Sequence, residues 1–146
     1  MCEPEANKKR PANPYDAQFS THYTIAASLV KGRFTLAELT DEAIADPAVL
    51  ALCDKVRYEV DPDSAFPRYY SGEVVVELKD GRTVRHREAQ NRGSDARPLS
   101  AAEIIDKFHG NAARAMSASR AQRVVDATLA LDRAGDLTTL AQSLSA

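Results

Sequence analysis

The sequence predicts an α+β fold, in which a small antiparallel sheet carries helices packed on it as a two-layer domain, followed by a helical tail. Apolar residues recur at helical spacing in residues 16–31 and again after residue 98. Between them, "GEVVVELKDGRTVRHREA" at residues 72–89 alternates apolar and polar residues around an Asp-Gly pair. Because helices lie at both ends and strands in the middle, the order differs from the alternating pattern of a parallel sheet.

Length and charge narrow the class of protein. A chain of 146 residues is one domain long, and such a chain buries about 68–70% of its unfolded surface. Hydrophobic residues make up 44% and charged residues 27%, near the globular average, which argues against global disorder. The formal net charge of −2 gives no electrostatic reason for a nucleic acid or a membrane as partner, and we expect neither.

Cysteine usage and hydropathy indicate a reduced setting. Cys2 and Cys53 are the two cysteines, with no CxxC pair and no Cys/His cluster, so neither a disulfide framework nor a zinc site is expected. No stretch approaches the ~20 apolar residues of a membrane span, and residues 1–10 lack the apolar segment of a signal peptide. We expect a cytoplasmic protein.

A helix is predicted from Asp16 to Lys31, after a polar, proline-containing start that we interpret as a disordered or linker N-terminus over residues 1–12. Asp16 is the expected cap, and Gly32 suits the left-handed residue that ends a helix. The expected inward face consists of Phe19, Tyr23, Ala26, Ala27 and Val30.

Two shorter helices and a strand are predicted next. Thr35–Glu38 has the form of a capping box, and Asp46-Pro47 is a typical helix start. The second of these helices has an apolar stripe of Val49, Leu50, Cys53 and Val56. Alternation of Val56, Tyr58 and Val60 predicts a strand that ends at Asp61-Pro62.

The best-defined prediction is a β-hairpin over residues 72–89. Val74, Val76 and Leu78 alternate with Glu73, Val75, Glu77 and Lys79 before Asp80-Gly81, the pair that type I′ turns favour. Together with the strand at residues 56–60, this makes three strands. Three are few for a sheet, which suggests that one strand is supplied from elsewhere.

The tail is predicted to be helical. After the polar loop "QNRGSDARP", Ser100 to Glu103 forms a capping box that opens a helix with Ile104, Ile105 and Phe108 inward and Gly110 as its stop. A long helix follows over residues 119–134, then a short one from Asp136. We therefore divide the chain at residues 13–97 and 98–146.

No motif with its own chemistry is visible. His22, His86 and His109 have no partner at catalytic or metal-ligand spacing, and GxSxG, HExxH, P-loop and GxGxxG patterns do not occur. We interpret the histidines as structural or solvated, with His22 the strongest candidate for a pocket edge. The sequence thus assigns no catalytic, cofactor-binding or metal-binding residue, and we expect no cofactor.

Two charged stretches of the sequence each allow a functional and a structural interpretation. Residues 82–97 hold five arginines against Glu88 and Asp95, which fits either recognition of a carboxylate or phosphate or a hairpin edge kept soluble by charge; we favour the second. An acidic run has no basic residue inside it, and helix capping explains it better than metal binding. Its members are Glu38, Asp41, Glu42, Asp46 and Asp54.

The stretch "DAQFSTHYTIAASLVKG" at residues 16–32 resembles the pattern E-A-K-F-S-x-x-Y-x-x-A-x-x-L-x-x-G of the MmgE/PrpD family. That family includes 2-methylcitrate dehydratase, cis-aconitate decarboxylase and iminodisuccinate epimerase. Gln18 departs from the usual lysine. Three further segments resemble the family in the same order: "LTDEAIADPAVLALCDKVRYEVDP", "VVVELKDGRTV" and "RPLSAAEIIDKF".

The resemblance implies a fragment. Family members are much longer, with a large helical domain, a smaller α+β lid domain and closing helices that return to the helical domain. Residues 13–97 resemble the lid, and residues 98–146 the helical tail that would pack on a missing helical domain. The family's catalytic His, Lys and Asp residues, and its pocket tyrosine, belong to upstream sequence. Its chemistry is cofactor-free elimination, decarboxylation or epimerisation beside carboxylates, by acid–base side chains.

Three functions compete. The first is the C-terminal lid-domain fragment of an MmgE/PrpD-type lyase or isomerase acting on small di- or tricarboxylates, inactive alone, dimeric, and partnered by a helical N-terminal domain or subunit. The second is a standalone binding or interaction module that uses the arginine-rich hairpin. The third, an independent small enzyme, has no visible acid–base pair. Apolar faces in the tail, which a standalone module does not need, favour the first; they surround Ile104, Phe108, Val124 and Leu131.

Overall fold

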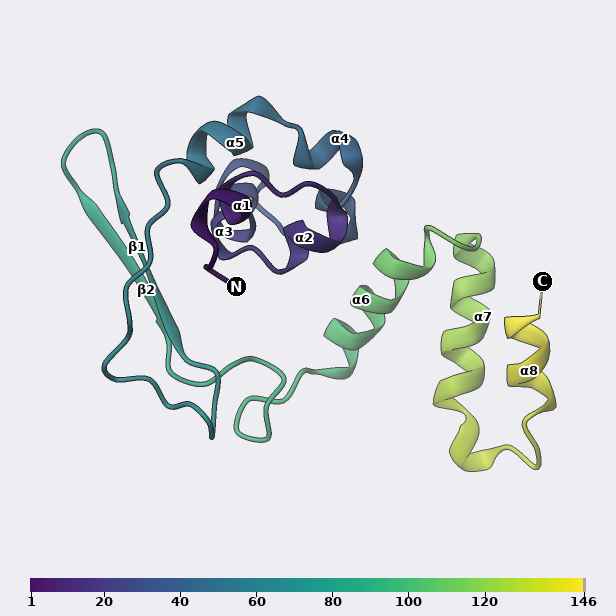
Figure 1. Cartoon of the computed structure of the whole chain (residues 1–146). Helices are drawn as coiled ribbons and strands as arrows, with labels where there is room; N and C mark the ends of the chain where they lie inside the picture. The colour runs from purple at the N-terminus through teal and green to yellow at the C-terminus, as the bar shows by residue number, and fades with distance from the viewer. Residues whose placement is uncertain (146) are drawn as a thin grey trace. The chain divides into compact units, whose positions relative to one another are not determined.

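A computed structural model describes residues 1–145 and confirms the predicted α+β class. Within these residues, eight α-helices accompany a two-stranded antiparallel sheet (Figure 1). The chain divides into two compact units, Met1–Val60 and Asp61–Ala146, which we call unit 1 and unit 2. Our expected boundaries at residues 12 and 97 stay predictions.

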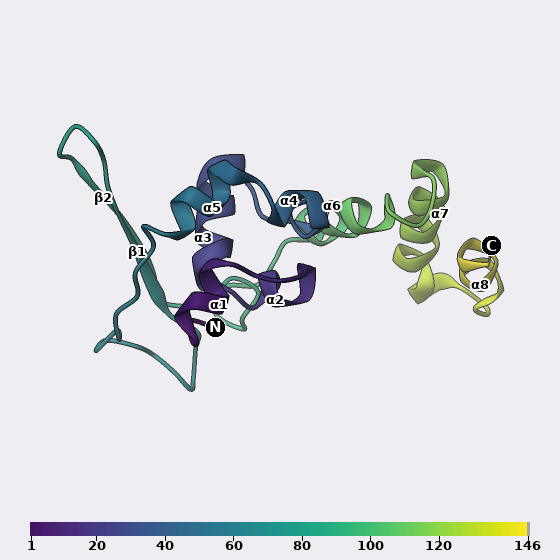
Figure 2. The ribbon, with the colours of Figure 1, turned by 45° about the horizontal axis from the view of Figure 1, so that its top comes forward.

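Unit 1 is helical and is built around α3. Its α1, α2 and α5 all contact α3, and α4 contacts α2 (Figures 1 and 2). Its elements are α1 (Glu5–Lys9), α2 (Pro14–Gln18), α3 (Thr21–Lys31), the 3-10 turn η1 (Leu36–Glu38), α4 (Asp41–Ile44) and α5 (Pro47–Cys53).

The helix predicted from Asp16 to Lys31 is two helices. Asn13, not Asp16, caps α2, and Ser20 starts α3 by accepting a 3.0 Å hydrogen bond from the backbone N–H of Tyr23. The break changes the direction of the chain, so Phe19 is 43% exposed and the prediction that it faces inward is wrong. Gly32 ends α3 with φ 71°, as predicted.

The core of unit 1 surrounds Tyr23. Its ring is fully buried, and its hydroxyl donates a 2.6 Å hydrogen bond to the backbone carbonyl of Glu38. Burial of Ala26, Ala27, Val49 and Cys53 follows the prediction, whereas Val30 is 40% exposed and does not belong to the core. The remaining core residues are Ala17 and Ile44, with Phe34, Leu39 and Leu52 packed against them.

Residues 56–60 are not a strand, and this prediction is wrong. Val60 is 90% exposed, and no strand pairs with this segment within residues 1–145. An extended segment becomes a strand only when a neighbour takes up its backbone hydrogen bonds. The alternating pattern is present, but the described chain offers no partner for it.

Unit 2 begins with the predicted hairpin, β1 (Gly72–Glu77) and β2 (Thr83–Glu88), in which Val76 pairs with Val84. Its turn differs from type I′, which requires positive φ at both central residues. The N–H of Gly81 donates to the carbonyl of Leu78 at 3.0 Å, and Gly81 has φ 86°, whereas no non-glycine residue among residues 1–145 has positive φ. The turn therefore reverses over Lys79 and Asp80, and Gly81 is the left-handed residue that follows.

The tail of unit 2 is helical, as predicted. Ser100 and Glu103 form the expected capping box. The first helix continues through Gly110, so the prediction that it stops there is wrong. Ile104 is 55% exposed, so the prediction that it faces inward is also wrong. The long helix is interrupted by a 3-10 turn. The elements are α6 (Ala101–Ala112), α7 (Ala118–Leu129), η2 (Leu131–Arg133) and α8 (Thr138–Leu144). None of the helices within residues 1–145 has the length and hydropathy that crossing a bilayer demands.

Candidate functional site

His22, which we interpreted as structural or solvated and as the strongest histidine candidate for a pocket edge, is buried near the start of α3. Only 1% of the residue is exposed. Neither ring nitrogen has a hydrogen-bond partner among the described residues, and the nearest carboxylate oxygen, Oε1 of Glu5, lies 4.0 Å from Nε2. The ring meets Tyr58 edge to face, with centroids 6.0 Å apart. A side chain enclosed in this way cannot reach a substrate in solution.

The electrostatics of this site keep His22 neutral. Burial, and then the nearby Lys9 ammonium, hold the pKa of the imidazole below its usual value, against the opposing effect of Glu5 and Glu3. The hydrogen bond to Glu3 raises the pKa of Tyr58 to about 12. These shifts come from packing and local pairing around His22.

The other histidines lie on the surface of unit 2. His86 faces Glu88 across 3.0 Å in β2 and is largely exposed. His109 lies in the last turn of α6, where a cation is favoured by the helix dipole, and its ring contacts Phe108. Neither lines either of the two depressions described below.

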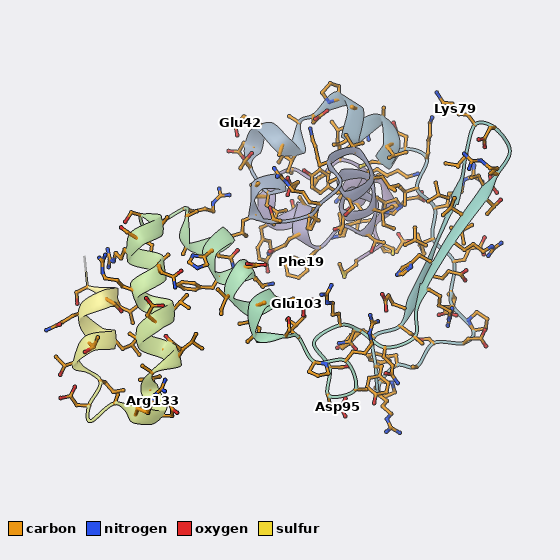
Figure 3. All side chains as sticks on the ribbon, turned by 180° about the vertical axis from the view of Figure 1, so that it is seen from behind. Phe19, Glu42, Lys79, Asp95, Glu103 and Arg133 are labelled. Atoms are coloured by element: carbon orange, nitrogen blue, oxygen red, sulfur yellow. The ribbon has the colours of Figure 1, made fainter. Side chains whose placement is uncertain are left out.

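Each arginine of residues 82–97 lies against a carboxylate. Arg85 is the most weakly paired, with its guanidinium 3.5 Å from Glu73. The hairpin also carries Lys79 at its turn, and Asp95 lies in the loop that follows it (Figure 3). This mutual neutralisation favours a charged, soluble edge over an anion-binding cluster. The remaining pairs are Arg82 with Asp80, Arg87 with Asp61, Arg92 with Glu103 and Arg97 with Glu88.

The acidic run serves local structure. Glu38 accepts hydrogen bonds from the Thr35 N–H at 2.8 Å and from Arg33 at 2.9 Å, and Asp46 caps α5 while pairing with Lys31 at 2.6 Å. These contacts occupy oxygens of Glu38 and Asp46 that a metal ion would need. Among the residues that the structure describes, no group of His, Cys, Asp or Glu has the arrangement of a metal site.

Both thiols are free, and two shallow depressions lie on the described surface. Cys53 is buried in the core, and burial raises the pKa of its thiol. A depression of about 410 Å³ in unit 1 is lined by Arg10 and Asp41 among apolar residues, and one of about 430 Å³ lies where α7 meets α8, beside Arg123 and Asp126. Neither lining includes a histidine, cysteine, lysine or tyrosine. Our assignment of no catalytic residue stays a prediction.

Large apolar side chains are exposed along the helical tail. Ile104 on α6 and Leu129 at the end of α7 are 55% and 57% exposed. Leu131, Leu137 and Leu144 are exposed as well. The sequence places apolar residues here at helical spacing, and in the described chain much of that surface meets no other element.

The amino-acid sequence is similar to a known domain family and to several enzymes. Residues 4–133 match the MmgE/PrpD C-terminal domain. The chain is 28% identical over 140 residues to cis-aconitate decarboxylase of Mus musculus, covering 94% of this chain and 28% of that protein. It is 33% identical over 113 residues to the Homo sapiens cis-aconitate decarboxylase, covering 76% and 23% of the two chains.

A bacterial relative extends the comparison. The chain is 31% identical over 150 aligned positions to 2-methylcitrate dehydratase of Salmonella typhimurium, covering 88% of this chain and 28% of that enzyme. It thus spans less than a third of the length of the curated relatives it matches. The extent of the domain match shows that this chain belongs to the MmgE/PrpD family, as its C-terminal domain.

Proposed function

We propose that this chain is the C-terminal lid portion of an MmgE/PrpD-type lyase or isomerase that acts on small di- or tricarboxylates, and that it is inactive until it meets a helical N-terminal domain or subunit. The observation that carries the proposal is the match of residues 4–133 to the family's C-terminal domain. The relatives' names, cis-aconitate decarboxylase and 2-methylcitrate dehydratase, support the class of substrate.

Surface chemistry supports the need for a partner. Burial of apolar surface stabilises a protein by roughly 25 cal/mol per Å². Ile104, Leu129 and Leu137 are each more than half exposed, so this stabilisation is not realised in the chain alone. A contiguous helical domain or a separate subunit would cover such residues. The two depressions described within residues 1–145 are lined by no histidine, cysteine, lysine or tyrosine, which agrees with a catalytic centre completed by that partner.

The binding-module hypothesis has weaker support. It relies on the arginine-rich hairpin, where each of the five arginines contacts a carboxylate of this chain. An anion would have to displace those contacts. Charge reversal at Arg85 and Arg87 remains its direct test, since that hypothesis requires the loss of ligand binding.

A complementation experiment tests the main proposal. The 146-residue chain is mixed with the helical part of the Salmonella typhimurium relative, produced without its own C-terminal domain. Complex formation is measured by light scattering, and dehydration of 2-methylcitrate and release of CO₂ from cis-aconitate are followed. We expect no turnover by either part alone, and a complex with a gain of at least one of these activities.

The matched variants are Ile104→Asp, which places a charge on the exposed face of α6, and Asp132→Asn, which changes an exposed residue of η2. The first should weaken the complex and the second should leave it intact. Turnover by the chain alone would refute its inactivity. If neither a complex nor activity forms with this or other helical parts of the family, the partner proposal fails.

A dimeric state and a cytoplasmic location belong to the same proposal. The dimer rests on the family resemblance, and sedimentation of the purified chain with its partner tests it. The location rests on the two free thiols, Cys2 and Cys53, a usage typical of reducing compartments. Fluorescent tagging in the producing cell tests it.

A further inference from the structure

The start of α3 is covered by residues 1–10, which we call the N-terminal segment. The Thr21 N–H donates to the carbonyl of Met1 at 3.1 Å, and the Ser20 hydroxyl donates to the carbonyl of Lys8 at 2.5 Å. In this segment α1 lies against α3 (Figures 1 and 2). It has no side-chain cap and contributes no buried residue. The segment is therefore fixed by a few polar contacts and not by a core of its own.

His22 lies in the surface that the N-terminal segment meets. Only 1% of this residue is exposed, and both ring nitrogens lack a hydrogen-bond partner among the described residues. A buried neutral imidazole without partners loses its hydration, but a buried imidazolium without partners costs much more. The closed arrangement is therefore compatible with one protonation state only.

Three features oppose a proton on His22 in the closed arrangement. Burial is the largest, and the Lys9 ammonium of α1 is the next. His22 is also the second residue of α3, where the positive end of the helix dipole disfavours a cation. All three disappear or weaken when the N-terminal segment leaves.

Two carboxylates of the same segment face His22 with the opposite effect, but both are already engaged. The Glu5 carboxylate lies 2.6 Å from the ammonium of Lys9, and its Oε1 is 4.0 Å from Nε2 of His22. The positive charge of Arg57 also acts on Glu5 and lowers the pKa of its carboxyl. Glu3 accepts the hydrogen bond from the hydroxyl of Tyr58. Tyr58 otherwise presents its ring to His22. Neither carboxylate makes a hydrogen bond to the imidazole.

We propose that His22 is a proton-operated latch: the N-terminal segment stays on α3 while the imidazole is neutral and is released when His22 takes up a proton, with the Tyr23 core intact. The inference uses the packing of unit 1 alone and does not depend on the enzymatic proposal. It provides a switch at the beginning of the domain, driven by mild acidification.

The direction of the pH effect follows from linkage. In the open form His22 is solvated, with a pKa near 6.5, and in the closed form its pKa is lower. Closure is therefore fully favoured above about pH 6.5 and weakens as the pH falls from there to the lower value. Because one proton is taken up, the opening equilibrium constant should rise about tenfold per pH unit within that window.

Amide hydrogen exchange on the whole 146-residue chain tests the latch. The reporters are the amides of Lys8 and Thr21, which donate to the carbonyls of Pro4 and Met1, and the reference is the amide of Gly32, which donates to Ser28. Rates are corrected for intrinsic exchange. The reporters should show about a tenfold rise in opening per pH unit below about pH 6.5, while the reference stays flat.

Two variants separate the latch from general acid sensitivity. His22→Phe keeps a buried ring that cannot titrate, and it should abolish the slope at both reporters. His86→Gln removes an exposed histidine and should leave the slope unchanged. If His22→Phe does not fold, NMR titration of the His22 ring in the unchanged chain replaces it. Opening independent of pH, a slope retained in His22→Phe, or a ring titration that does not coincide with opening would overturn the proposal.

Discussion

Unit 1 and unit 2 bury different kinds of residue. In unit 1, Tyr23, Val49 and Cys53 are completely buried around one helix. In unit 2, the buried apolar residues within the described chain are small: Ala112, Ala121, Val124 and Val125. Several larger aliphatic residues of unit 2, such as Ile104 and Leu137, are exposed. Unit 1 therefore has a closed core, whereas much of the apolar surface of unit 2 stays open.

The cause lies in how the elements meet. Short capped elements return the chain of unit 1 to α3 several times, so α1, α2 and α5 share one neighbour. In unit 2, β1 pairs with β2, α6 contacts α7 and α7 contacts α8, so contacts run between successive elements. A two-stranded hairpin is marginal alone. Disruption should therefore spread through unit 1 and stay local in unit 2.

The largest expected effect is at Tyr23. Tyr23→Ala removes a fully buried ring and its 2.6 Å hydrogen bond to the carbonyl of Glu38, and should lower the free energy of unfolding of unit 1 by about 3–5 kcal/mol. Urea titration followed by circular dichroism measures it. Tyr15→Ala, at a residue 68% exposed, is the matched control and should change stability by no more than ~0.5 kcal/mol. Equal effects of the two variants would refute the proposed core.

The next effect is at Glu38 and depends on pH. Burial raises the pKa of this carboxyl, but hydrogen bonds from Arg33 and Thr35 outweigh burial and hold the pKa below its usual value of 4.5. Stability from Glu38 is thus fully present above about pH 4.5 and is lost as the pH falls through the lower folded value. Glu38→Gln should destabilise unit 1 by about 1.5–3 kcal/mol at neutral pH.

Thermal melts across pH measure this difference. The gap between Glu38→Gln and the unchanged chain should shrink below about pH 4.5, whereas Glu59→Gln, at an exposed position, should produce no such gap. A gap that persists unchanged into acid would contradict the assigned role of the carboxylate.

A pair of glycines sharpens the comparison between the units. Gly32 has φ 71° at the end of α3, and Gly81 has φ 86° in the hairpin turn. Alanine at either position should cost about 1–2 kcal/mol, because a Cβ disfavours the left-handed conformation. Gly32→Ala should lower protection of amides throughout unit 1, whereas Gly81→Ala should affect the hairpin alone.

Hydrogen exchange resolved by residue separates the two outcomes. Gly110→Ala is the control of opposite sign, because Gly110 lies inside α6 with open space around it, and alanine should stabilise that helix by about 0.5–1 kcal/mol. If Gly81→Ala reduced protection in α7 as strongly as in β2, contacts in unit 2 would not be local.

The smallest effect is expected at Ile104. Ile104→Ser changes a residue 55% exposed and should alter the free energy of unfolding of this chain by no more than about 0.5 kcal/mol. Val124→Ala, at a residue 6% exposed, should destabilise α7 measurably. Denaturant titration compares them, and a larger loss for Ile104→Ser than for Val124→Ala would contradict the open surface of unit 2.

Local chemistry determined much of this protein from its sequence. The capping boxes at Thr35–Glu38 and Ser100–Glu103, the Asp46-Pro47 start and the left-handed Gly32 all occur as predicted. The hairpin at residues 72–89 was also predicted from the sequence, and β1 and β2 pair there. These features succeed because each depends on residues within one turn or one strand pair. The family membership also came from short collinear motifs, which the match over residues 4–133 confirms.

The tertiary structure alone decided the features that depend on distant neighbours. Alternation at residues 56–60 does not make a strand without a partner, and helical spacing at Ile104 does not bury it without a facing element. His22 became the most informative histidine only when α1 was placed against α3, since burial and the distance to Glu5 belong to the assembled unit. Spacing along the chain specifies local geometry, whereas burial and protonation depend on which surfaces meet in space.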